Sequence, residues 1–442
     1  MEGPVGPTLF RLAVPMVFGI LSMVAYNLAD TFFVGQLGSD QLAALSFTFP
    51  VVLTIASLAQ GIGMGTSAVV SRAVGAAEYD RVRRLTADSL ILGLTVVGVF
   101  AGVGLLTIDP LFSLLGARGV ILDYIREYME VWYLGMIFVV VPMIGNNIIR
   151  ATGDSRTPGM VMVIGAAANV ILDPLLIFGL GPVPALGIRG AAMATLIGRG
   201  ITFCVAMYVL IVREKLLTLQ ADPIREVFRS WLEILHIGIP TAGARMIIPV
   251  GQGVVTRIIA GYGAAAVAGY GVATRIEFFS LAALNALSSV IPAFIGQNFG
   301  AGKIDRVREG FRESRNFSFY VGGALFLVYL LLAPRIAGLF NADPTVVATA
   351  SLYMRVVSVA YAGQGLYLVV NAGLNVLRRP LTAAALGAME MFALIVPLAL
   401  LGSHLSGIAG IVTGIGVSYA ITGIAAWFTV MRVVDRAAAP SP

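Results

Sequence analysis

The chain has 442 residues, of which 58% are hydrophobic and only 12% charged, and its mean hydropathy is +0.91. A water-soluble protein of this length cannot bury so much apolar surface, so the composition excludes an ordinary soluble protein and predicts lipid as the main solvent. The net charge of +6 does not indicate nucleic-acid binding, because the basic residues lie in connections that orient a membrane chain. The single cysteine, Cys204, excludes an intrachain disulfide and a thiolate metal cluster.

Apolar runs long enough to cross a bilayer recur along the whole chain. A hydrocarbon core of about 30 Å needs roughly 20 helical residues. The predicted spans are 9–35, 42–71, 86–107, 122–149, 157–179, 188–212, 234–259, 265–297, 315–333, 346–376, 381–402 and 407–431. We therefore predict an all-α membrane protein with twelve transmembrane helices.

Basic residues gather in alternate connections. One set of connections is rich in Arg and Lys, as in 72–84, 213–229 and 303–315, whereas the opposite set holds little beyond Arg118, Arg189 and Arg335. Since basic residues favour the cytoplasmic side, the pattern predicts that both termini are cytoplasmic, as expected for a multi-pass protein of the cell membrane.

The two halves of the sequence repeat one another. "VGAAEYDRVRR" (74–84) aligns with "FGAGKIDRVRE" (299–309) at an offset of 225, which also pairs Pro15 with Pro240. Each repeat holds six spans, an even number, so both enter the membrane from the same side. This predicts two six-helix lobes related by a pseudo-two-fold axis along the membrane normal, as in some secondary transporters.

Three segments follow from the repeat. We predict an N-terminal lobe at 1–212, a cytoplasmic linker helix at 213–233 and a C-terminal lobe at 234–442. The linker "REKLLTLQADPIREVFRSWLE" is amphipathic and is expected to lie on the membrane surface.

Two carboxylates lie at membrane depth in the first half. Asp30 follows Tyr26 by four residues and Asp173 follows Asn169 by four, so each acid shares a helix face with a polar neighbour. Ionisable residues in spans usually face a bundle interior or a water-filled cavity. Three further polar residues could complete a pocket with these four: Tyr128, Asn146 and Thr195.

The chemistry of this predicted pocket leaves two coupling ions open. Desolvation favours the neutral form of a carboxylate, which suits a proton carrier, and two neighbouring acids titrate as a pair. The oxygens of Asp30, Asp173 and Asn169 could instead bind Na⁺. Pro15 lies within the first span and permits a kink, which is either a hinge that responds to Asp30 or a static bend.

The second half carries different charges. By the same offset Asp30 corresponds to Val255, and no acid stands at the equivalent of Asp173. The deep acids of this half are Glu277 and Glu390. The deep basic residues of this half either pair with these two glutamates as structural bridges or line the cavity opposite the acids: Arg245, Arg257, Arg275 and Arg355. Arg199, midway along the sixth span, is a candidate partner for Asp30 or Asp173, and its role stays open.

No motif for catalysis or nucleotide hydrolysis is present. The sequence has no H-E-x-x-H, P-loop or G-x-S-x-G pattern, so we expect neither an enzyme nor a cofactor. Transport would then be driven by an ion gradient.

Several stretches together resemble the multidrug and toxic compound extrusion (MATE) family. They are "LAVPMVFGILSMVAYNLADTFFVGQLG", "RATGDSRTP", "NVILDPLLIFG" and "GIRGAAMATLIGR". The resemblance covers essentially the whole chain and is nearest to the DinF-like and archaeal branch. It implies a V-shaped pair of six-helix lobes and cation-coupled export of organic cations. In that branch an acid network of the first lobe binds the coupling ion. The resemblance implies that Asp30, Asn169 and Asp173 form this network here and that Pro15 is the bending proline. Tyr128 and Asn146 also match the pattern of the branch.

The branch with a second-lobe acidic site has a glutamate in its seventh helix, and "ARMIIPVGQGVV" (244–255) has none. We therefore expect a monomeric H⁺- or Na⁺-coupled multidrug antiporter that works by alternating access. Its partners would be amphipathic cations and membrane lipid, not nucleic acid. The alternative is a lipid-linked oligosaccharide flippase of the same superfamily, which the arginines of the second half would suit.

Overall fold

The computed structural model describes residues 3–37, 39–179, 184–217 and 223–438, and these are helical with no strand among them. In lipid every backbone N–H and C=O must be satisfied within the chain, which continuous helices achieve. The first half forms α1 (Val5–Gly35), α2 (Ser39–Gly75), α3 (Tyr79–Leu114), α4 (Val120–Leu134), α5 (Met136–Ala151), α6 (Arg156–Phe178), α7 (Gly187–Tyr208) and the π-helical η1 (Val209–Arg213).

The second half has a similar order of helices. It forms α8 (Ile224–Ala260), α9 (Ala264–Ser280), α10 (Ala282–Gly300), α11 (Ile304–Gly338), α12 (Pro344–Val357), the 3₁₀ turn η2 (Ser358–Ala360), α13 (Tyr361–Val376), α14 (Pro380–Ala388), the π-helical η3 (Met389–Ile395) and α15 (Val396–Ala438).

The described helices account for twelve spans. Nine are long and apolar enough to cross a membrane, and two bent pairs, α4 with α5 (47°) and α9 with α10 (48°), bring the total to eleven. The apolar stretch Pro380–Ala438 is 59 residues long and leaves helical geometry at Ser406 and Gly407, so it makes two spans. The predicted all-α membrane fold with twelve spans is confirmed.

Several helices extend beyond the predicted spans. α3 begins at Tyr79, α8 at Ile224 and α11 at Ile304, each about seven to eleven residues before the apolar run that hydropathy marks. The linker helix predicted at 213–233 stays a prediction, because 218–222 lie outside the described residues. From Ile224 on, this segment is the start of α8, which continues without a break into the following span. No proline or glycine interrupts this junction, so nothing in the sequence ends the helix there.

The repeat is visible in backbone geometry. α2 ends at Gly75 and α10 at Gly300, and α3 and α11 start at Tyr79 and Ile304, which preserves the offset of 225. The residues before α3 and α11, Glu78 and Lys303, have nearly identical φ/ψ values of −85°/64° and −84°/65°. The same local sequence therefore folds the same way twice.

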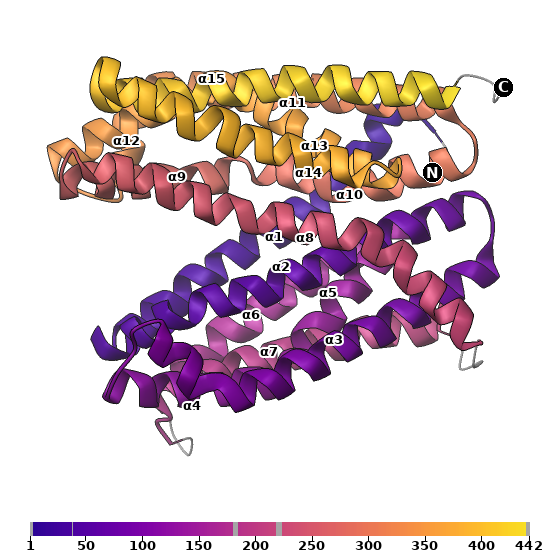
Figure 1. Cartoon of the computed structure of the whole chain (residues 1–442), viewed down its shortest axis with the longest axis horizontal. Helices are drawn as coiled ribbons and strands as arrows, with labels where there is room; N and C mark the ends of the chain where they lie inside the picture. Colours follow the sequence, from indigo (N-terminus) through magenta and orange to yellow (C-terminus); the bar gives the residue numbers. More distant parts are fainter. Residues whose placement is uncertain (1–2, 38, 180–183, 218–222, 439–442) are drawn as a thin grey trace. The chain divides into compact units, whose positions relative to one another are not determined.

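The chain divides into two compact units, each a bundle of helices (Figure 1). The N-terminal unit comprises Phe18–Val74 and Glu78–Ala242, and the C-terminal unit comprises Gly75–Ala77 with the described residues up to Val17 and from Gly243 on. α1 and α8 each contribute residues to both units. The lobe boundaries at 212 and 234 stay a prediction.

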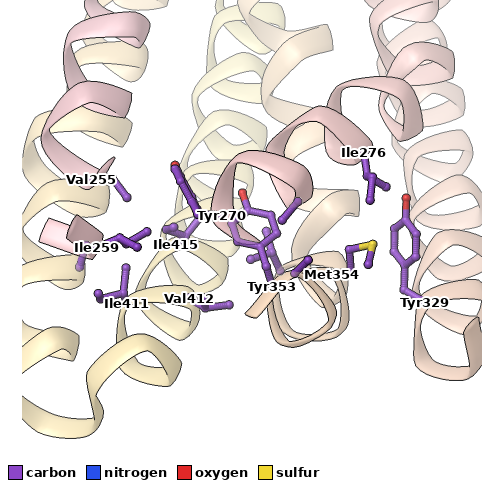
Figure 2. Packing of buried hydrophobic residues seen from close by; sticks show 14 of the residues in the cluster. Val255, Ile259, Tyr270, Ile276, Tyr329, Tyr353, Met354, Ile411, Val412 and Ile415 are labelled. Carbon is purple, nitrogen blue, oxygen red and sulfur yellow. The ribbon is translucent and has the colours of Figure 1, made fainter. Parts of the chain in front are cut away.

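The C-terminal unit has a large buried core. Figure 2 shows part of it, in which aliphatic side chains from α8 and α15 pack with tyrosines from α9, α11 and α12. The rings of Tyr270 and Tyr353 meet edge to face with centroids 5.7 Å apart. Aromatic side chains with hydroxyl groups therefore carry polar atoms deep into this core.

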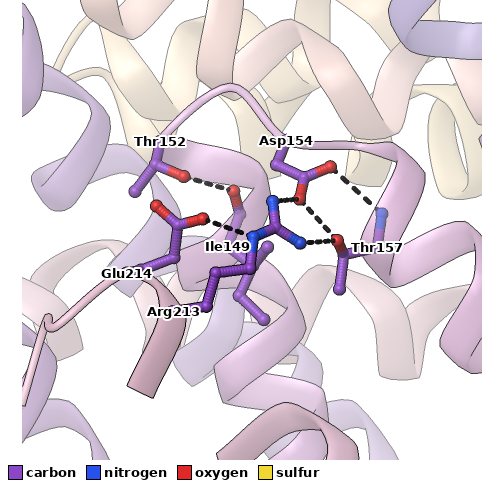
Figure 3. A network of polar contacts seen from close by, with 6 residues as sticks. All are labelled: Ile149, Thr152, Asp154, Thr157, Arg213 and Glu214. Atoms are coloured by element: carbon purple, nitrogen blue, oxygen red, sulfur yellow. Dashed lines mark hydrogen bonds and ion pairs between the residues drawn. The ribbon is translucent and has the colours of Figure 1, made fainter. Parts of the chain in front are cut away.

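A polar network fixes one membrane-external connection of the N-terminal unit (Figure 3). Asp154 precedes α6 and accepts the Thr157 backbone N–H at 3.0 Å, which caps the helix, and Arg213 donates to its Oδ2 at 2.6 Å. Burial would raise the pKa of Asp154, but hydrogen bonds from Thr157 and Arg213 outweigh it and lower that pKa below its usual value. The end of η1 is thereby tied to the start of α6.

We expect Asp154→Asn to lower thermal stability by about 1 kcal/mol at neutral pH, because a partly exposed charged pair is lost while the helix cap survives. The folded pKa of Asp154 lies below that of the unfolded chain, so the contribution is present above pH 3.8 and is lost as the pH falls through the folded value. Thermal unfolding of detergent-purified protein at several pH values measures it. A deficit that grew as the pH fell would contradict this account.

The two halves of α15 approach so closely that only glycine fits. A Cβ on Gly410 would overlap the backbone oxygen of Gly402. We expect Gly410→Ala to destabilise the protein by about 1–3 kcal/mol, since backbone must move to admit the methyl group. Gly323→Ala in α11 is the matched control, because a Cβ there meets nothing within 4 Å. Equal unfolding temperatures for the two variants would refute the packing argument.

Candidate functional site

Small residues bring α6 and α7 together in the N-terminal unit. A Cβ on Gly165 would lie 2.6 Å from the Thr202 side chain, and one on Gly198 would lie 3.4 Å from the Gly165 oxygen. Such residues let membrane helices approach closely. The approach brings Asn169 of α6 against Thr195 of α7.

Among the acids of this unit whose burial the structure describes, Asp173 is the most enclosed, with 0% of its surface exposed. With its amide nitrogen turned towards the carboxylate, Asn169 donates to Asp173 Oδ2 at 2.7 Å and accepts from the Thr195 backbone N–H at 3.2 Å. Asp173 Oδ1 has no hydrogen-bond partner. One oxygen of this buried carboxylate is therefore hydrogen-bonded, whereas the other has no donor.

The remaining predicted residues of α1 and α4 lie around this pair. Asp30 is close enough to Asp173 for the two carboxylates to repel each other. Tyr128, buried in α4, interacts electrostatically with both acids and with Tyr26. The Tyr26 hydroxyl is within hydrogen-bonding reach of Thr195.

A cavity of about 50 Å³ adjoins the cluster. Four predicted residues line it: Tyr26, Asn146, Asn169 and Thr195. The Asn146 Oδ1 atom is buried without a hydrogen-bond partner. A water needs roughly 10–15 Å³ by this kind of measure, so the space suits a few waters or a hydrated ion, whereas drug-sized ligands need about 300 Å³ or more.

The structure therefore brings together all seven predicted pocket residues, although Asp30, Asp173 and Tyr128 do not themselves line the cavity. Pro15 lies apart, because it is 15 residues from Asp30 along α1, about 22 Å of helix. α1 remains helical through Pro15. Its hinge role stays a prediction.

Arg199 is the lining residue that the sequence left without a role. Its guanidinium carbon lies 5.8 Å from the centroid of the Tyr26 ring, a cation–π geometry. Among the ion pairs of the described residues, none joins Arg199 to Asp30 or Asp173. Its position midway along the span signalled a buried charge, but not an aromatic partner on another helix. Three methionines, Met23, Met143 and Met162, also line the cavity.

The predicted Na⁺ ligands are two carboxylates and an amide, from Asp30, Asp173 and Asn169. Oxygen ligands of this type suit a hard cation. In the described part of the chain, no three His, Cys, Asp or Glu side chains gather as a metal site, so the acid pair would need the amide and other oxygens to complete a coordination shell. The Na⁺ site stays a prediction.

Comparison with known proteins identifies the family. The MatE family model matches twice, at residues 15–175 and 240–401, and the two starts differ by the offset of 225 found in the repeat. The chain belongs to the MatE family, the MATE transporters, and is a transporter rather than an enzyme.

Named relatives span almost the whole chain. A protein of Shewanella oneidensis named "FAD transporter" is 36% identical over 98% of this chain and 96% of its own length. The multidrug export protein MepA of Staphylococcus aureus is 27% identical over 98% of this chain and 95% of its own. The crystal structure of the Vibrio cholerae MATE transporter VcmN in the bent form has a TM-score of 0.92 at 29% identity, covering 98% of this chain and 98% of that one.

Proposed function

We propose that this chain is a cation-coupled exporter of small molecules in which Asp30 and Asp173 carry the coupling ion. One observation carries the proposal: Asp173 is fully buried, and only one of its two oxygens has a hydrogen-bond donor. A buried carboxylate without full compensation costs several kcal/mol, so a proton or a cation is needed there in at least one state of the cycle.

Coupling follows from differential affinity. An ion shifts a two-state equilibrium only if it binds one state better than the other. Mutual repulsion between Asp30 and Asp173 makes the ion-free state costly, and binding of one cation relieves it. We propose that loading favours release of the exported molecule on the outer side, and that the loaded carrier then returns inward.

The coupling ion is H⁺ or Na⁺, and the size of the cavity supports an ion site more than a drug site. Na⁺ would take oxygens of Asp30, Asp173 and Asn169, whereas H⁺ needs only the acid pair. We propose that the protein works in the cell membrane as a monomer with both termini cytoplasmic, consistent with the basic connections.

Organic cations are the first substrate class that we propose. Support comes from the relatives named as multidrug exporters, such as MepA. None of the relatives reported above is named as a flippase, so export of a soluble small molecule is proposed in preference to flipping of a lipid-linked oligosaccharide.

We expect Asp173→Asn and Asp30→Asn to abolish ion-driven export, because a neutral amide can neither gain nor lose a cation at the site. The rate of ethidium transport is measured in proteoliposomes loaded with ethidium, to which a pH gradient or a Na⁺ gradient is applied separately. The gradient that drives wild-type transport identifies the ion.

Asp80→Asn is the control, since Asp80 is a solvent-exposed acid at the start of α3. It should transport like the unmodified protein. Normal gradient-driven export by both pocket variants, at normal protein levels, would refute the proposed role of the pocket.

A second candidate substrate is a flavin dinucleotide. Arg199 lines the cavity beside the Tyr26 ring without an ion pair to either aspartate, and a guanidinium of this kind suits a phosphate group and an aromatic ring system. The 36% identical relative is named as an FAD transporter. A cavity of about 50 Å³ would have to widen to admit such a molecule.

If the substrate is the dinucleotide, we expect Arg199→Gln to lower FAD transport by about tenfold or more, equivalent to about 1.4 kcal/mol of lost binding. Transport of ethidium should be unchanged or faster, since a positive charge is removed. Both substrates are measured by fluorescence in the same vesicles. FAD transport that is unaffected in the variant, or absent in the wild type, would exclude this candidate.

A further inference from the structure

Three arginines without an acid partner lie in two neighbouring helices of the C-terminal unit. They are Arg312 and Arg315 in α11 and Arg432 in α15. Among the ion pairs of the described residues, none includes any of the three, although Glu309 lies one turn before Arg312. Arg315 donates to the Asn316 side chain at 3.2 Å, which is a neutral acceptor. Their positive charges are therefore not neutralised within the described part of the chain.

Two contacts set the register of α11 against α15. Arg308 pairs with Asp435 at 2.9 Å, and the guanidinium carbon of Arg315 lies 4.8 Å from the centroid of the Trp427 ring. Seven residues forward along α11 correspond to eight residues back along α15, so the two helices run antiparallel here.

This register brings the three arginines to one level. Arg312 lies between the two contacts on α11, and Arg432 lies between them on α15. Both are exposed, whereas Arg315 is half-buried against the indole ring of Trp427. We call these three arginines and Trp427 the α11–α15 cluster.

The cluster lies where the apolar spans end. Arg315 is the first residue of the predicted span 315–333, and Arg432 follows the last residue of the span 407–431. Tryptophan is enriched where a bilayer meets water, and arginine near the end of a span keeps its charge at that level. On the bilayer side of the cluster, four large side chains of α11 and α15 are exposed: Phe319, Tyr320, Ile424 and Phe428.

The N-terminal unit does not repeat this arrangement. At the offset of 225, Arg312 corresponds to Ala87 and Arg315 to Leu90. The arginines near the start of α3 are neutralised by ion pairs instead: Arg81 with Glu78 and Glu233, Arg83 with Asp80, and Arg84 with Glu226. Unpaired arginine at this level is therefore a property of the C-terminal unit and not of the duplicated fold.

The deep arginines of the C-terminal unit differ from the cluster in their level. They lie within the apolar spans rather than at a span end: Arg245, Arg257, Arg275 and Arg355. None of them forms an ion pair with Glu277 or Glu390 in the described part of the chain, so the structural bridges considered for them are not formed there. Tyr353 and Gln364 hydrogen-bond the two glutamates instead.

We propose that the α11–α15 cluster binds the headgroup of an anionic phospholipid, in the leaflet on the side of the C-terminus. The lipid phosphate accepts hydrogen bonds from the guanidinium groups, whose planar fork of donors matches phosphate oxygens. The Trp427 ring holds the Arg315 guanidinium by cation–π contact. The acyl chains lie along the exposed apolar side chains of the same two helices, which a soluble anion would leave uncovered.

Charge favours an anionic lipid over a zwitterionic one. Three unpaired arginines near a membrane surface attract a headgroup of net negative charge, and the attraction acts within a Debye length of the surface. A choline headgroup brings a cation of its own next to the same arginines. The bound lipid ties the paired ends of α11 and α15 to the leaflet, so the C-terminal unit has a lipid anchor that the N-terminal unit lacks at this position.

Thermal unfolding of the purified full-length protein in a neutral detergent measures the binding. A ligand that binds only the folded state raises the unfolding midpoint as its concentration rises. Three probes are titrated separately: dioleoylphosphatidylglycerol, dioleoylphosphatidylcholine and inorganic phosphate. We expect a saturable rise with phosphatidylglycerol alone. An equal rise with the zwitterionic lipid or with inorganic phosphate overturns the proposal.

The triple variant Arg312→Gln/Arg315→Gln/Arg432→Gln assigns the binding to the cluster. We expect its affinity for phosphatidylglycerol to fall about tenfold or more, because each basic residue near the membrane surface contributes to the attraction. The matched control is Arg118→Gln/Arg189→Gln/Arg335→Gln, which removes the same charge from three exposed arginines of the opposite connections. It should bind the lipid like the wild type.

Two results with these variants overturn the proposal. One is a triple variant that binds phosphatidylglycerol as tightly as the wild type, and the other is an equal loss of affinity in the control. If the triple variant does not fold, Arg315→Gln is compared with Arg335→Gln, and we expect a loss of about fivefold in the first alone. Equal affinities of these two single variants likewise overturn the proposal.

Discussion

A carboxylate buried among helices, with fewer donors than it can accept, is the interaction around which the N-terminal unit is arranged. Asp173 receives one hydrogen bond from Asn169, one turn earlier on α6, and Asn169 is in turn held by the Thr195 backbone of α7. The contact with Thr195 requires α6 and α7 to be as close as Gly165 and Gly198 allow. The packing of small residues and the chemistry of the acid are therefore one constraint. A larger side chain at either glycine would separate Thr195 from Asn169 and release the amide that faces Asp173.

Length and hydropathy determine the number of spans because the bilayer thickness sets the length of helix that lipid can surround. They do not determine where a helix ends. The helices beginning at Tyr79, Ile224 and Ile304 extend past their apolar runs, since nothing breaks them where the charged residues begin. A hydropathy boundary marks the edge of the lipid, whereas a helix boundary needs a cap, a glycine or a proline.

The pocket was predictable to the extent that its residues share helix faces. A spacing of four residues places Tyr26 and Asp30 on one helix face, and likewise Asn169 and Asp173. The structure brings both pairs together. Contacts between helices far apart in sequence were not predictable in this way. The stacking of Arg199 on Tyr26 and the tyrosine partners of Glu277 depend on how the bundle packs, which no local pattern encodes.

The two units share their backbone plan but differ in their buried acids. Backbone features recur at the offset of 225 down to the loop before α3 and α11, and the helix break at Gly135 has a counterpart near Ala360, where the 3₁₀ turn η2 interrupts the α-helix. The acids at membrane depth, Asp30, Asp173, Glu277 and Glu390, do not recur, because a buried carboxylate depends on a few side-chain donors rather than on the backbone. Duplication thus preserves the scaffold, and each unit can acquire its own ionisable groups wherever its packing supplies a donor. The two-fold symmetry therefore belongs to the helices, whereas the ionisable chemistry belongs to the side chains.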